Sequence, residues 1–266
     1  MDSPLLLPIA RVQPENAQAK TLYFDHALHS QPGQFVMAWL PGIDQKPFSV
    51  AYDNGREFGF TVFPVGPLSQ ALVSLQPGDR VGITGPYGHP FSVKKDRHYI
   101  TIGGGYGAGP LALLAERAAA AGAQVDFCLG AKTEGLLLFA QRVKTVPNLR
   151  VHIATDDGSL GRRGYVTEIL EELLLETGAQ TRLIAACGPE LMEKKVLDLC
   201  NEHDVECEIS LERYTKCGFG VCGQCCVDPL GIRMCVEGPV VDRETANRIS
   251  EFGAYHRDKS GTKIRY

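Results

Sequence analysis

The chain has 266 residues, of which 44% are hydrophobic and 22% are charged, as is ordinary for a soluble globular protein. Its formal net charge of -4, without any run of Lys or Arg, argues against nucleic acid as a partner. No apolar stretch approaches the length that spans a bilayer, so we expect no membrane partner, and the length suits two domains with a small appendage.

The nine cysteines are an odd number in a chain too long to need disulfides in place of a core, which argues against a secreted disulfide scaffold. Five of them are scattered, mostly in apolar surroundings: Cys128, Cys187, Cys200, Cys207 and Cys226. The first ten residues have a three-leucine run but no basic segment before it, unlike a signal peptide. We therefore expect a protein of the reducing cytoplasm.

Residues 1–95 contain short predicted strands separated by Pro and Gly, which favours an N-terminal antiparallel β-barrel. The strands are expected at residues 5–12, 20–25, 34–40, 47–52, 58–64 and 80–84, with one helix at 68–75. The stretch Gly66-Pro67-Leu68-Ser69 opens this helix, so its free amides would suit a pyrophosphate. Ser69 equally suits a capping role.

A candidate flavin site is the tetrapeptide Lys46-Pro47-Phe48-Ser49. Taken alone, it is more typical of a strand that begins with a proline. In the functional interpretation, Lys46 supplies a cation and Ser49 a hydroxyl to a flavin nucleotide, while Pro47 fixes the backbone beside the isoalloxazine ring.

Residues 96–210 alternate between apolar strands and helices, which predicts a five-stranded parallel Rossmann-like sheet. The strands are expected at 98–102, 124–129, 149–154, 182–187 and 206–211, and the helices at 109–121, 134–145, 166–176 and 191–203.

The first of these strands runs into Gly103-Gly104-Gly105-Tyr106-Gly107, in which Gly103, Gly105 and the following Ala108 fit G-x-G-x-x-A. The preceding strand and the following helix are the context in which this motif binds the pyrophosphate of a dinucleotide. The alternative is a purely structural turn, which would hardly need so many glycines.

Two further stretches follow strand ends on the same side of the expected sheet. Asp156 and Asp157 would accept hydrogen bonds from ribose hydroxyls and repel a 2'-phosphate, which favours NAD over NADP, although an acidic turn is often only solvated. Cys187, followed by Gly188 and Pro189, would lie at the same edge. The plainer interpretation of Cys187 is a small buried apolar residue.

The segment from 212 to 240 contains five cysteines, four of which follow the order C-x4-C-x2-C-x9-C, close to the plant-type pattern for a 2Fe-2S cluster. The proposed ligands are Cys217, Cys222, Cys225 and Cys235. Interspersed glycines give the loop the backbone freedom to converge on one small core. A four-cysteine zinc site is the alternative, but zinc knuckles usually contain two C-x2-C pairs. Cys226 is a possible substitute ligand that we expect to pack away instead.

The order of these motifs, with TDDGSLGRRG, CGPELM and LERYTKCGFGVCGQC as they stand, resembles the electron-transfer subunits of dihydroorotate dehydrogenase B in the ferredoxin reductase superfamily. The resemblance spans the full length. It implies FAD on the barrel, NAD on the sheet, and a 2Fe-2S cluster in a small C-terminal domain, residues 211–266. It also implies a partner, an FMN-containing dihydroorotate dehydrogenase catalytic subunit, in a heterotetramer with two copies of each chain.

Carried over by residue, the resemblance assigns Lys46 to Ser49 to the family's R-P-x-S flavin motif and Leu68-Ser69 to its later flavin element. Gly103 to Gly107 match the dinucleotide loop, Gly188-Pro189 the segment beside the nicotinamide, and Val62-Phe63-Pro64 the next flavin strand. This chain has Lys46 and Pro64 where the family usually has Arg, which predicts weaker FAD binding because Lys offers one contact point where Arg offers two. Ser49 and Cys187 are the side chains expected to tune hydride transfer.

The implied function is a relay in which electrons from dihydroorotate reach NAD+ through the cluster and FAD. One alternative is the small subunit of a related complex, of the NADH-dependent ferredoxin:NADP oxidoreductase or sulfide dehydrogenase type. Another is a non-catalytic scaffold that binds zinc. The tail, residues 240–266, is rich in basic and aromatic residues and is either a docking surface for the partner or an extension wrapped on its own chain.

Overall fold

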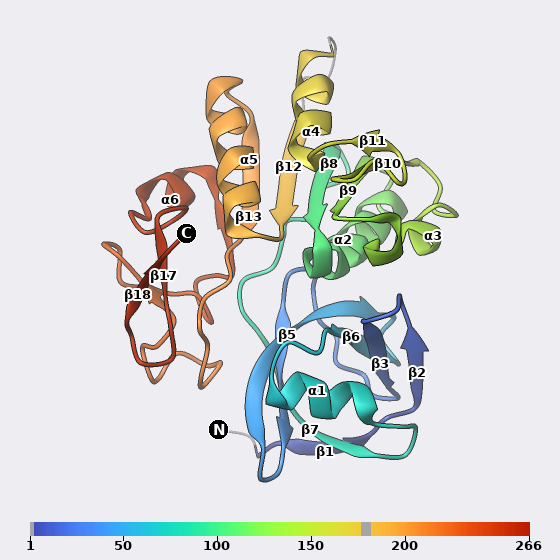
Figure 1. Cartoon of the computed structure of the whole chain (residues 1–266), viewed down its shortest axis with the longest axis vertical. Coiled ribbons are helices and arrows are strands. Elements are labelled where there is room, and N and C mark those ends of the chain that lie inside the picture. Colours follow the sequence, from blue (N-terminus) through green and yellow to red (C-terminus); the bar gives the residue numbers. More distant parts are fainter. Residues whose placement is uncertain (1–2, 177–181) are drawn as a thin grey trace.

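The computed structural model describes residues 3–176 and 182–266. They form two seven-stranded sheets, one antiparallel and the other mostly parallel. The two sheets lie one above the other, and the C-terminal segment runs along one side of both (Figure 1). No helix within the two described ranges is long and apolar enough to cross a membrane.

The antiparallel sheet has the strand order β1-β7-β4-β5-β6-β3-β2. Its strands are β1 (Leu5–Pro8), β2 (Arg11–Pro14), β3 (Lys20–Phe24), β4 (Phe35–Leu40), β5 (Asp44–Asp53), β6 (Phe58–Val62) and β7 (Arg80–Tyr87). Phe24, Phe58 and Phe60 stack in its core, which helix α1 (Pro67–Ser74) closes with the buried Leu68 and Leu72. The expected antiparallel architecture is confirmed.

The prediction of one strand at residues 5–12 is wrong, because the chain changes sheet edge in its middle. Ile9 is only 2% exposed and turns into the core. Its amide donates to the Asp79 carbonyl beside β7, whereas the next amide, of Ala10, donates to the Tyr23 carbonyl on β3, each at 2.8 Å. The two edge strands are therefore consecutive in the chain, and the sheet is rolled up.

The second sheet has the order β11-β10-β9-β8-β12-β13-β16. Its strands are β8 (His98–Gly104), β9 (Gln124–Ala131), β10 (Leu149–Thr155), β11 (Arg162–Arg163), β12 (Arg182–Cys187), β13 (Glu206–Ser210) and β16 (Val240–Asp242). The five expected parallel strands are confirmed. Two short edge strands extend the sheet, and β16 pairs antiparallel with β13. Because β16 belongs to the C-terminal segment, the chain beyond residue 211 is joined to this sheet.

Helices cover both faces of the parallel sheet. The helices α2 (Ala108–Ala120) and α3 (Ala140–Val143) pack in one core, and α4 (Val166–Leu175) and α5 (Glu190–Glu202) in the other. The helix expected at 134–145 is broken into a single 3-10 turn, η2 (Glu134–Leu136), and the short α3. Leu138 and Phe139 between them are buried, and Phe139 has a positive φ of 60°. Burial of these two side chains therefore outweighs local helix propensity.

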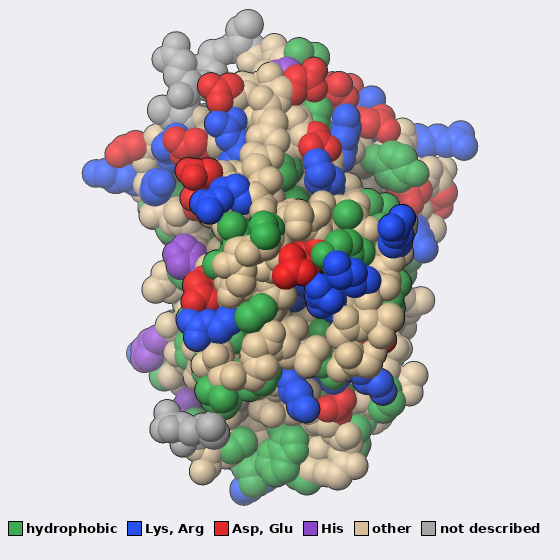
Figure 2. All heavy atoms as spheres, turned by 90° about the vertical axis from the view of Figure 1, so that its left-hand side faces the viewer, with side chains coloured by type: hydrophobic (Ala, Val, Ile, Leu, Met, Phe, Trp, Pro, Cys, Tyr) green, Lys and Arg blue, Asp and Glu red, His purple; other side chains and the backbone are tan. Residues whose placement is uncertain are grey.

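The C-terminal segment contains two hairpins and one helix. Its elements are β14 (Cys226–Val227), β15 (Ile232–Arg233), α6 (Arg243–Arg248), β17 (Tyr255–Arg257) and β18 (Lys263–Arg265). The tail packs against its own chain, because the Tyr266 hydroxyl donates to Glu190 Oε2 on α5 at 2.6 Å. On the face turned to the viewer in Figure 2, Lys and Arg side chains are interspersed with Asp and Glu.

Candidate functional site

The glycine-rich stretch 103–107, hereafter the dinucleotide loop, lies directly against the segment that follows β12. Gly103 pairs with Cys187 across the two strands, and η1 (Gly105–Gly107) leads into α2. A Cβ atom on Gly107 would lie 2.1 Å from the Cys187 carbonyl oxygen. Only glycine therefore fits at this position, and the loop and the Cys187 turn form one surface at the carboxyl edge of the sheet.

Helix α2 also joins this surface to the antiparallel sheet. A Cβ atom on Gly109 would lie 3.2 Å from the Ala51 Cβ on β5. The start of α2 has no side-chain cap, and its first amide, of Ala108, donates to the carbonyls of Gly105 and Tyr106 in the preceding 3-10 turn. The helix that follows the dinucleotide loop thus begins beside the strand that carries Ser49.

Tyr106 is the point where three segments meet. Its ring packs edge-on against Phe63 at the end of β6, with centroids 6.0 Å apart. Its hydroxyl donates to Glu212 Oε2 at 2.7 Å, at the start of the C-terminal segment. Partial burial of Tyr106, which is 51% exposed, raises the pKa of its hydroxyl, and the nearby Glu212 carboxylate raises it further. Tyr106 is therefore a neutral hydrogen-bond donor at physiological pH.

Cys187 is 8% exposed at the end of β12. Burial raises the pKa of its thiol, and the neighbouring Glu193 carboxyl raises it further, so the group is a thiol and not a thiolate at neutral pH. Gly188 lies in the same turn and is buried, whereas Pro189 is exposed. This burial matches the plainer sequence interpretation of Cys187, while its position at the ligand edge matches the functional one.

Glu193 is a residue at this site that the sequence analysis missed. Its side chain is 1% exposed, and Oε1 accepts a hydrogen bond from the Gly188 amide at 2.9 Å. Burial raises the pKa of its carboxyl well above the usual value. The available signal was a carboxylate in the first helical turn after Cys187-Gly188-Pro189, but many helices have an acidic first turn for the dipole alone.

The tetrapeptide from Lys46 to Ser49 lies half-buried on β5. Phe48 stacks on Phe60 at 5.0 Å, and Ser49 pairs across the sheet with Phe35. The Lys46 ammonium forms an ion pair with Asp44 at 2.9 Å. Burial lowers the pKa of Lys46, but Asp44 and Tyr214 outweigh this effect and raise it overall, so Lys46 offers a full positive charge.

The other predicted flavin residues differ in their surroundings. The Ser69 hydroxyl accepts hydrogen bonds from the amides of Val65 and Gly66 at 3.0 and 2.9 Å, which is the capping role that the sequence allowed. Its neighbour Leu68 is buried in the core. Of the three residues at the end of β6, Val62 is buried, Phe63 half-buried and Pro64 exposed.

Asp156 and Asp157 lie in an exposed turn after β10, at the same sheet edge as the dinucleotide loop. Strand β10 is separated from β8 by β9 alone, a span of roughly 10 Å. Asp157 Oδ1 accepts hydrogen bonds from the Ser159 hydroxyl and amide, which lower the pKa of Asp157. Asp156 is exposed in the same turn.

The four cysteines lie in two pairs. Cys217 and Cys222 form one close pair, and Cys225 and Cys235 form the other, in which the Cys235 amide donates to Cys225 Sγ at 3.4 Å. Burial tends to raise the pKa of Cys217, but the amides of Cys222, Phe219 and Val221 outweigh it and lower the pKa to about 6. A lowered pKa favours the thiolate form that binds a metal.

This arrangement fits a 2Fe-2S cluster better than a single zinc ion. A cluster with two irons and four thiolates takes two thiolates at each iron, whereas zinc needs four ligands around one point. Gly218, Gly220 and Gly223 all have positive φ, between 69° and 88°, as the tight loop requires. Cys226 lies partly buried on β14, outside the two pairs.

The cysteine loop packs on the antiparallel sheet. A Cβ atom on Gly218 would lie 2.7 Å from the Met37 side chain on β4, and the Phe219 ring lies 6.3 Å from that of Tyr87 on β7. Cys225 and Cys235 share a buried core with Met37. The thiols, the strand with the predicted flavin residues and the dinucleotide loop thus lie in one continuous body.

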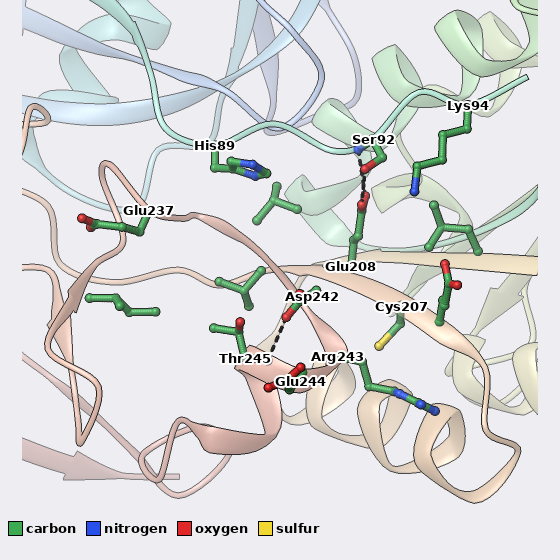
Figure 3. A pocket seen from close by; sticks show the side chains of 15 residues that line it. His89, Ser92, Lys94, Cys207, Glu208, Glu237, Asp242, Arg243, Glu244 and Thr245 are labelled. Atoms are coloured by element: carbon green, nitrogen blue, oxygen red, sulfur yellow. Dashed lines mark hydrogen bonds between the residues drawn. The ribbon is translucent and has the colours of Figure 1, made fainter.

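A cavity of about 650 Å³ lies elsewhere, between the linker that follows β7, the β13–β16 edge and α6 (Figure 3). Its lining includes the carboxylates of Glu206, Glu208, Glu237, Asp242 and Glu244. None of the predicted cofactor residues lines it. In Figure 3, Glu208 points to Ser92, whose amide donates to its carboxylate at 2.9 Å, so this carboxylate already has a partner.

Two family models match the chain. Residues 212–246 match the iron-sulfur cluster binding domain of dihydroorotate dehydrogenase B, and residues 101–198 match an oxidoreductase NAD-binding domain. Among solved structures, that of an NADH-dependent reduced ferredoxin-NADP oxidoreductase, studied for electron bifurcation, is 25% identical with a TM-score of 0.81 and covers 95% of both chains. The flavohaem-like FAD/NAD binding domain of a Vibrio cholerae nitric oxide dioxygenase, 19% identical, covers 77% of this chain and 95% of its own, and its TM-score of 0.65 shows a shared fold.

Curated relatives match over the full length. A protein of Methanocaldococcus jannaschii is 41% identical over 100% of both chains, and one of Methanocella arvoryzae is 42% identical over 98% of both. Each is named as a probable electron transfer subunit of NAD(+)-type dihydroorotate dehydrogenase B. With this identity over its whole length, and with the four cysteines inside the iron-sulfur match and the dinucleotide loop inside the NAD-binding match, the chain belongs to the family of dihydroorotate dehydrogenase B electron transfer subunits.

Proposed function

We propose that this chain passes electrons from dihydroorotate, oxidised at an FMN in a partner catalytic subunit, through a 2Fe-2S cluster and FAD to NAD+ in pyrimidine biosynthesis. The observation that carries the proposal is the continuity of the three predicted sites: paired cysteines packed on β4, predicted flavin residues on β5, and α2 packed on β5. Electron transfer requires such short separations, and the protein supplies distance and orientation while the cofactors supply the chemistry.

Each cofactor has its own set of residues in this proposal. Cys217, Cys222, Cys225 and Cys235 hold the cluster, Lys46 to Ser49 with Phe63 hold FAD, and the dinucleotide loop with Asp156 and Pro189 holds NAD. When bound, FAD supplies two-electron hydride exchange with NAD and one-electron exchange with the cluster. The chain's own acids and bases take no proton in this transfer.

Ser49 and Cys187 serve the hydride step by excluding water and fixing the nicotinamide. Their support is positional: Ser49 lies on β5 beside α2, and Cys187 lies against the dinucleotide loop. Because burial keeps Cys187 a neutral thiol, it orients the ring by contact and places no charge beside it. Tyr106, which the sequence assigned to the loop alone, closes the same space from the side of Phe63.

The finer assembly is part of the proposal. We expect a small cluster domain within residues 211–266 that faces the FMN-containing subunit, a heterotetramer with two copies of each chain, and a cytoplasmic location. The exposed Cys222 and Val221 at the tip of the cysteine loop support this orientation, since Val221 is 75% exposed.

The test is an anaerobic absorption titration of the purified chain with NADH and, separately, NADPH, alongside iron and acid-labile sulfide assays. We expect NADH to bleach both the flavin and the cluster bands, with two irons and two sulfides per chain. Zinc without labile sulfide or flavin would overturn the proposal and indicate a scaffold. Co-expression with a candidate FMN subunit then tests whether dihydroorotate reduces the same bands.

A second candidate is the small subunit of an electron-bifurcating ferredoxin-NADP oxidoreductase, favoured by the structural similarity over 95% of both chains. The two functions differ in the partner. Reduction of the cluster by a flavoprotein partner that oxidises NADPH, and not by one that oxidises dihydroorotate, would select this alternative.

A further inference from the structure

A contact between the Lys46 ammonium and Tyr214 links β5 to the C-terminal segment. Lys46 Nζ lies 3.3 Å from the Tyr214 hydroxyl and 4.9 Å from the centre of its ring. The two residues are 168 positions apart, and Tyr214 precedes the first cluster cysteine, Cys217, by three residues. Within the described ranges, this is the cation–π contact that joins the two segments.

Tyr214 is held in place from both sides along the chain. Arg213 is buried, with ion pairs to Glu190 at 2.6 Å and to Glu251 at 2.7 Å. Thr215 is also buried, and its hydroxyl donates to the Arg213 carbonyl at 3.1 Å. The backbone at Tyr214 is therefore anchored to α5 and to the tail, so the ring presents a fixed surface to Lys46.

A fixed aromatic ring changes what a lysine can do at this position. A lysine is a compact charge on a flexible stem, whereas an arginine has a planar fork that contacts a ligand at two points. Tyr214 and Asp44 together restrain the Lys46 ammonium from two directions. This restraint lowers the entropy that the side chain would lose when it binds an anionic ligand.

We propose that Tyr214 is a positioning residue that holds Lys46 on the flavin strand and ties that strand to the cluster cysteines. The inference rests on the proposed function, since it concerns the chain's residues toward FAD and the cluster. Lys46 then needs no guanidinium fork, because the C-terminal segment supplies the second point of restraint. Loss of Tyr214 is expected to weaken flavin binding and electron exchange between flavin and cluster together.

The test compares Tyr214→Phe and Tyr214→Leu with the wild-type chain. We expect FAD dissociation constants, measured by flavin fluorescence, to rise about 3-fold for the Phe variant and about 10-fold for the Leu variant. With FAD at saturating concentration, single-turnover reduction of the cluster by NADH should be slower in the Leu variant, with two irons and two sulfides retained. The matched control is Tyr255→Leu, because Lys263 lies 4.3 Å above that ring and both residues belong to the β17–β18 hairpin.

A rescue experiment separates positioning from a general loss of structure. Adding Lys46→Arg to Tyr214→Leu should return the FAD dissociation constant to within about 2-fold of wild type, because the fork replaces the lost restraint. Unchanged FAD affinity in Tyr214→Leu, equal losses in Tyr255→Leu, or absence of rescue would overturn the inference. If instead the wild-type chain binds neither FAD nor a cluster, the proposed function itself fails, so the two failures are distinguishable.

Discussion

At the scale of single residues, the candidate hydride site depends on close contacts that leave little freedom. Gly107 lies so close to the Cys187 carbonyl that no side chain fits, and the Glu193 carboxyl accepts a hydrogen bond from the Gly188 amide. The Cys187 turn is thus held by the dinucleotide loop through Gly107 and by the buried Glu193 carboxyl through Gly188. A small change there should affect hydride transfer more than it affects folding.

Replacing Cys187 with Ala is expected to slow flavin reduction by NADH about 10-fold while leaving the cluster absorption unchanged, because in the proposed function the thiol orients the nicotinamide and is not one of the four cluster ligands. Stopped-flow measurement of flavin bleaching tests this. The matched control is Cys128→Ala, a fully buried cysteine within β9 of the same sheet. An unchanged rate in the Cys187 variant would remove its proposed role.

We expect the choice between NADH and NADPH to depend on Asp156 as well. Replacing Asp156 with Ser should raise kcat/KM for NADPH roughly 5- to 10-fold, since an exposed carboxylate repels the 2'-phosphate. Kinetics with NADH and NADPH measure the change. Asp96→Ser, at the opposite edge of the sheet before β8, should leave both values as they are. Equal NADPH rates in both variants would place the discrimination elsewhere.

At the scale of elements, three neighbouring strands are joined by one buried carboxylate. Asp126 on β9 accepts from His98 on β8 at 2.6 Å, and from His152 and Arg150 on β10 at 2.6 and 2.8 Å. Burial by itself would raise the pKa of Asp126, but these hydrogen bonds outweigh it and hold the pKa well below its usual range. This group of four polar side chains lies at the amino edge of the sheet, away from the dinucleotide loop.

A carboxyl whose pKa is lowered on folding stabilises the protein above its unfolded pKa, about 4, and loses this contribution as the pH falls through the folded pKa. The free energy of unfolding should therefore decline below about pH 4. Replacing Asp126 with Asn should lower it by about 2–4 kcal/mol at pH 7 and flatten this decline. Urea unfolding between pH 7 and pH 3 measures both the loss of stability and its pH dependence. A variant whose free energy of unfolding falls with pH as steeply as that of the wild type would contradict the role of Asp126.

The elements also show where local patterns stop being informative. The alternation of strands and helices predicted all five central strands, because strands buried on both faces are continuous apolar runs. The same pattern failed at residues 134–145, where Leu138 and Phe139 leave helical geometry to fill the core beside α2. Residues 5–12 failed for a similar reason, since Ile9 turns inward between two sheet edges.

At the scale of the whole molecule, the tail completes the anchoring of the C-terminal segment. Tyr266 and the Gly253 amide both contact Glu190, at 2.6 and 2.8 Å, and Glu190 in turn pairs with the buried Arg213. The sequence left open whether the tail docks a partner or wraps its own chain. The structure shows that the tail wraps on its own chain. Docking of a partner remains a prediction for the exposed side of the β17–β18 hairpin.

Deleting residues 253–266 should lower the midpoint of thermal unfolding by several degrees, because Glu190 and Arg213 lose the cover of Tyr266. If the hairpin also docks the FMN subunit, co-purification should weaken as well. The conservative variant Tyr266→Phe, which keeps the hairpin and removes one hydrogen bond, separates the two effects. Full retention of partner assembly by the truncated chain would count against docking.

The sequence by itself determined the features that depend on spacing within a short stretch. The spacing of the four proposed cluster cysteines, a glycine loop between strand and helix, and five apolar strands each impose a local geometry, so they identify the family and its cofactor chemistry. Only the tertiary structure decided that Tyr214 meets Lys46, that Glu193 holds Gly188, and that β16 joins the parallel sheet. These contacts join segments whose approach is set by the packing of separate cores, and packing leaves no periodic trace in the sequence.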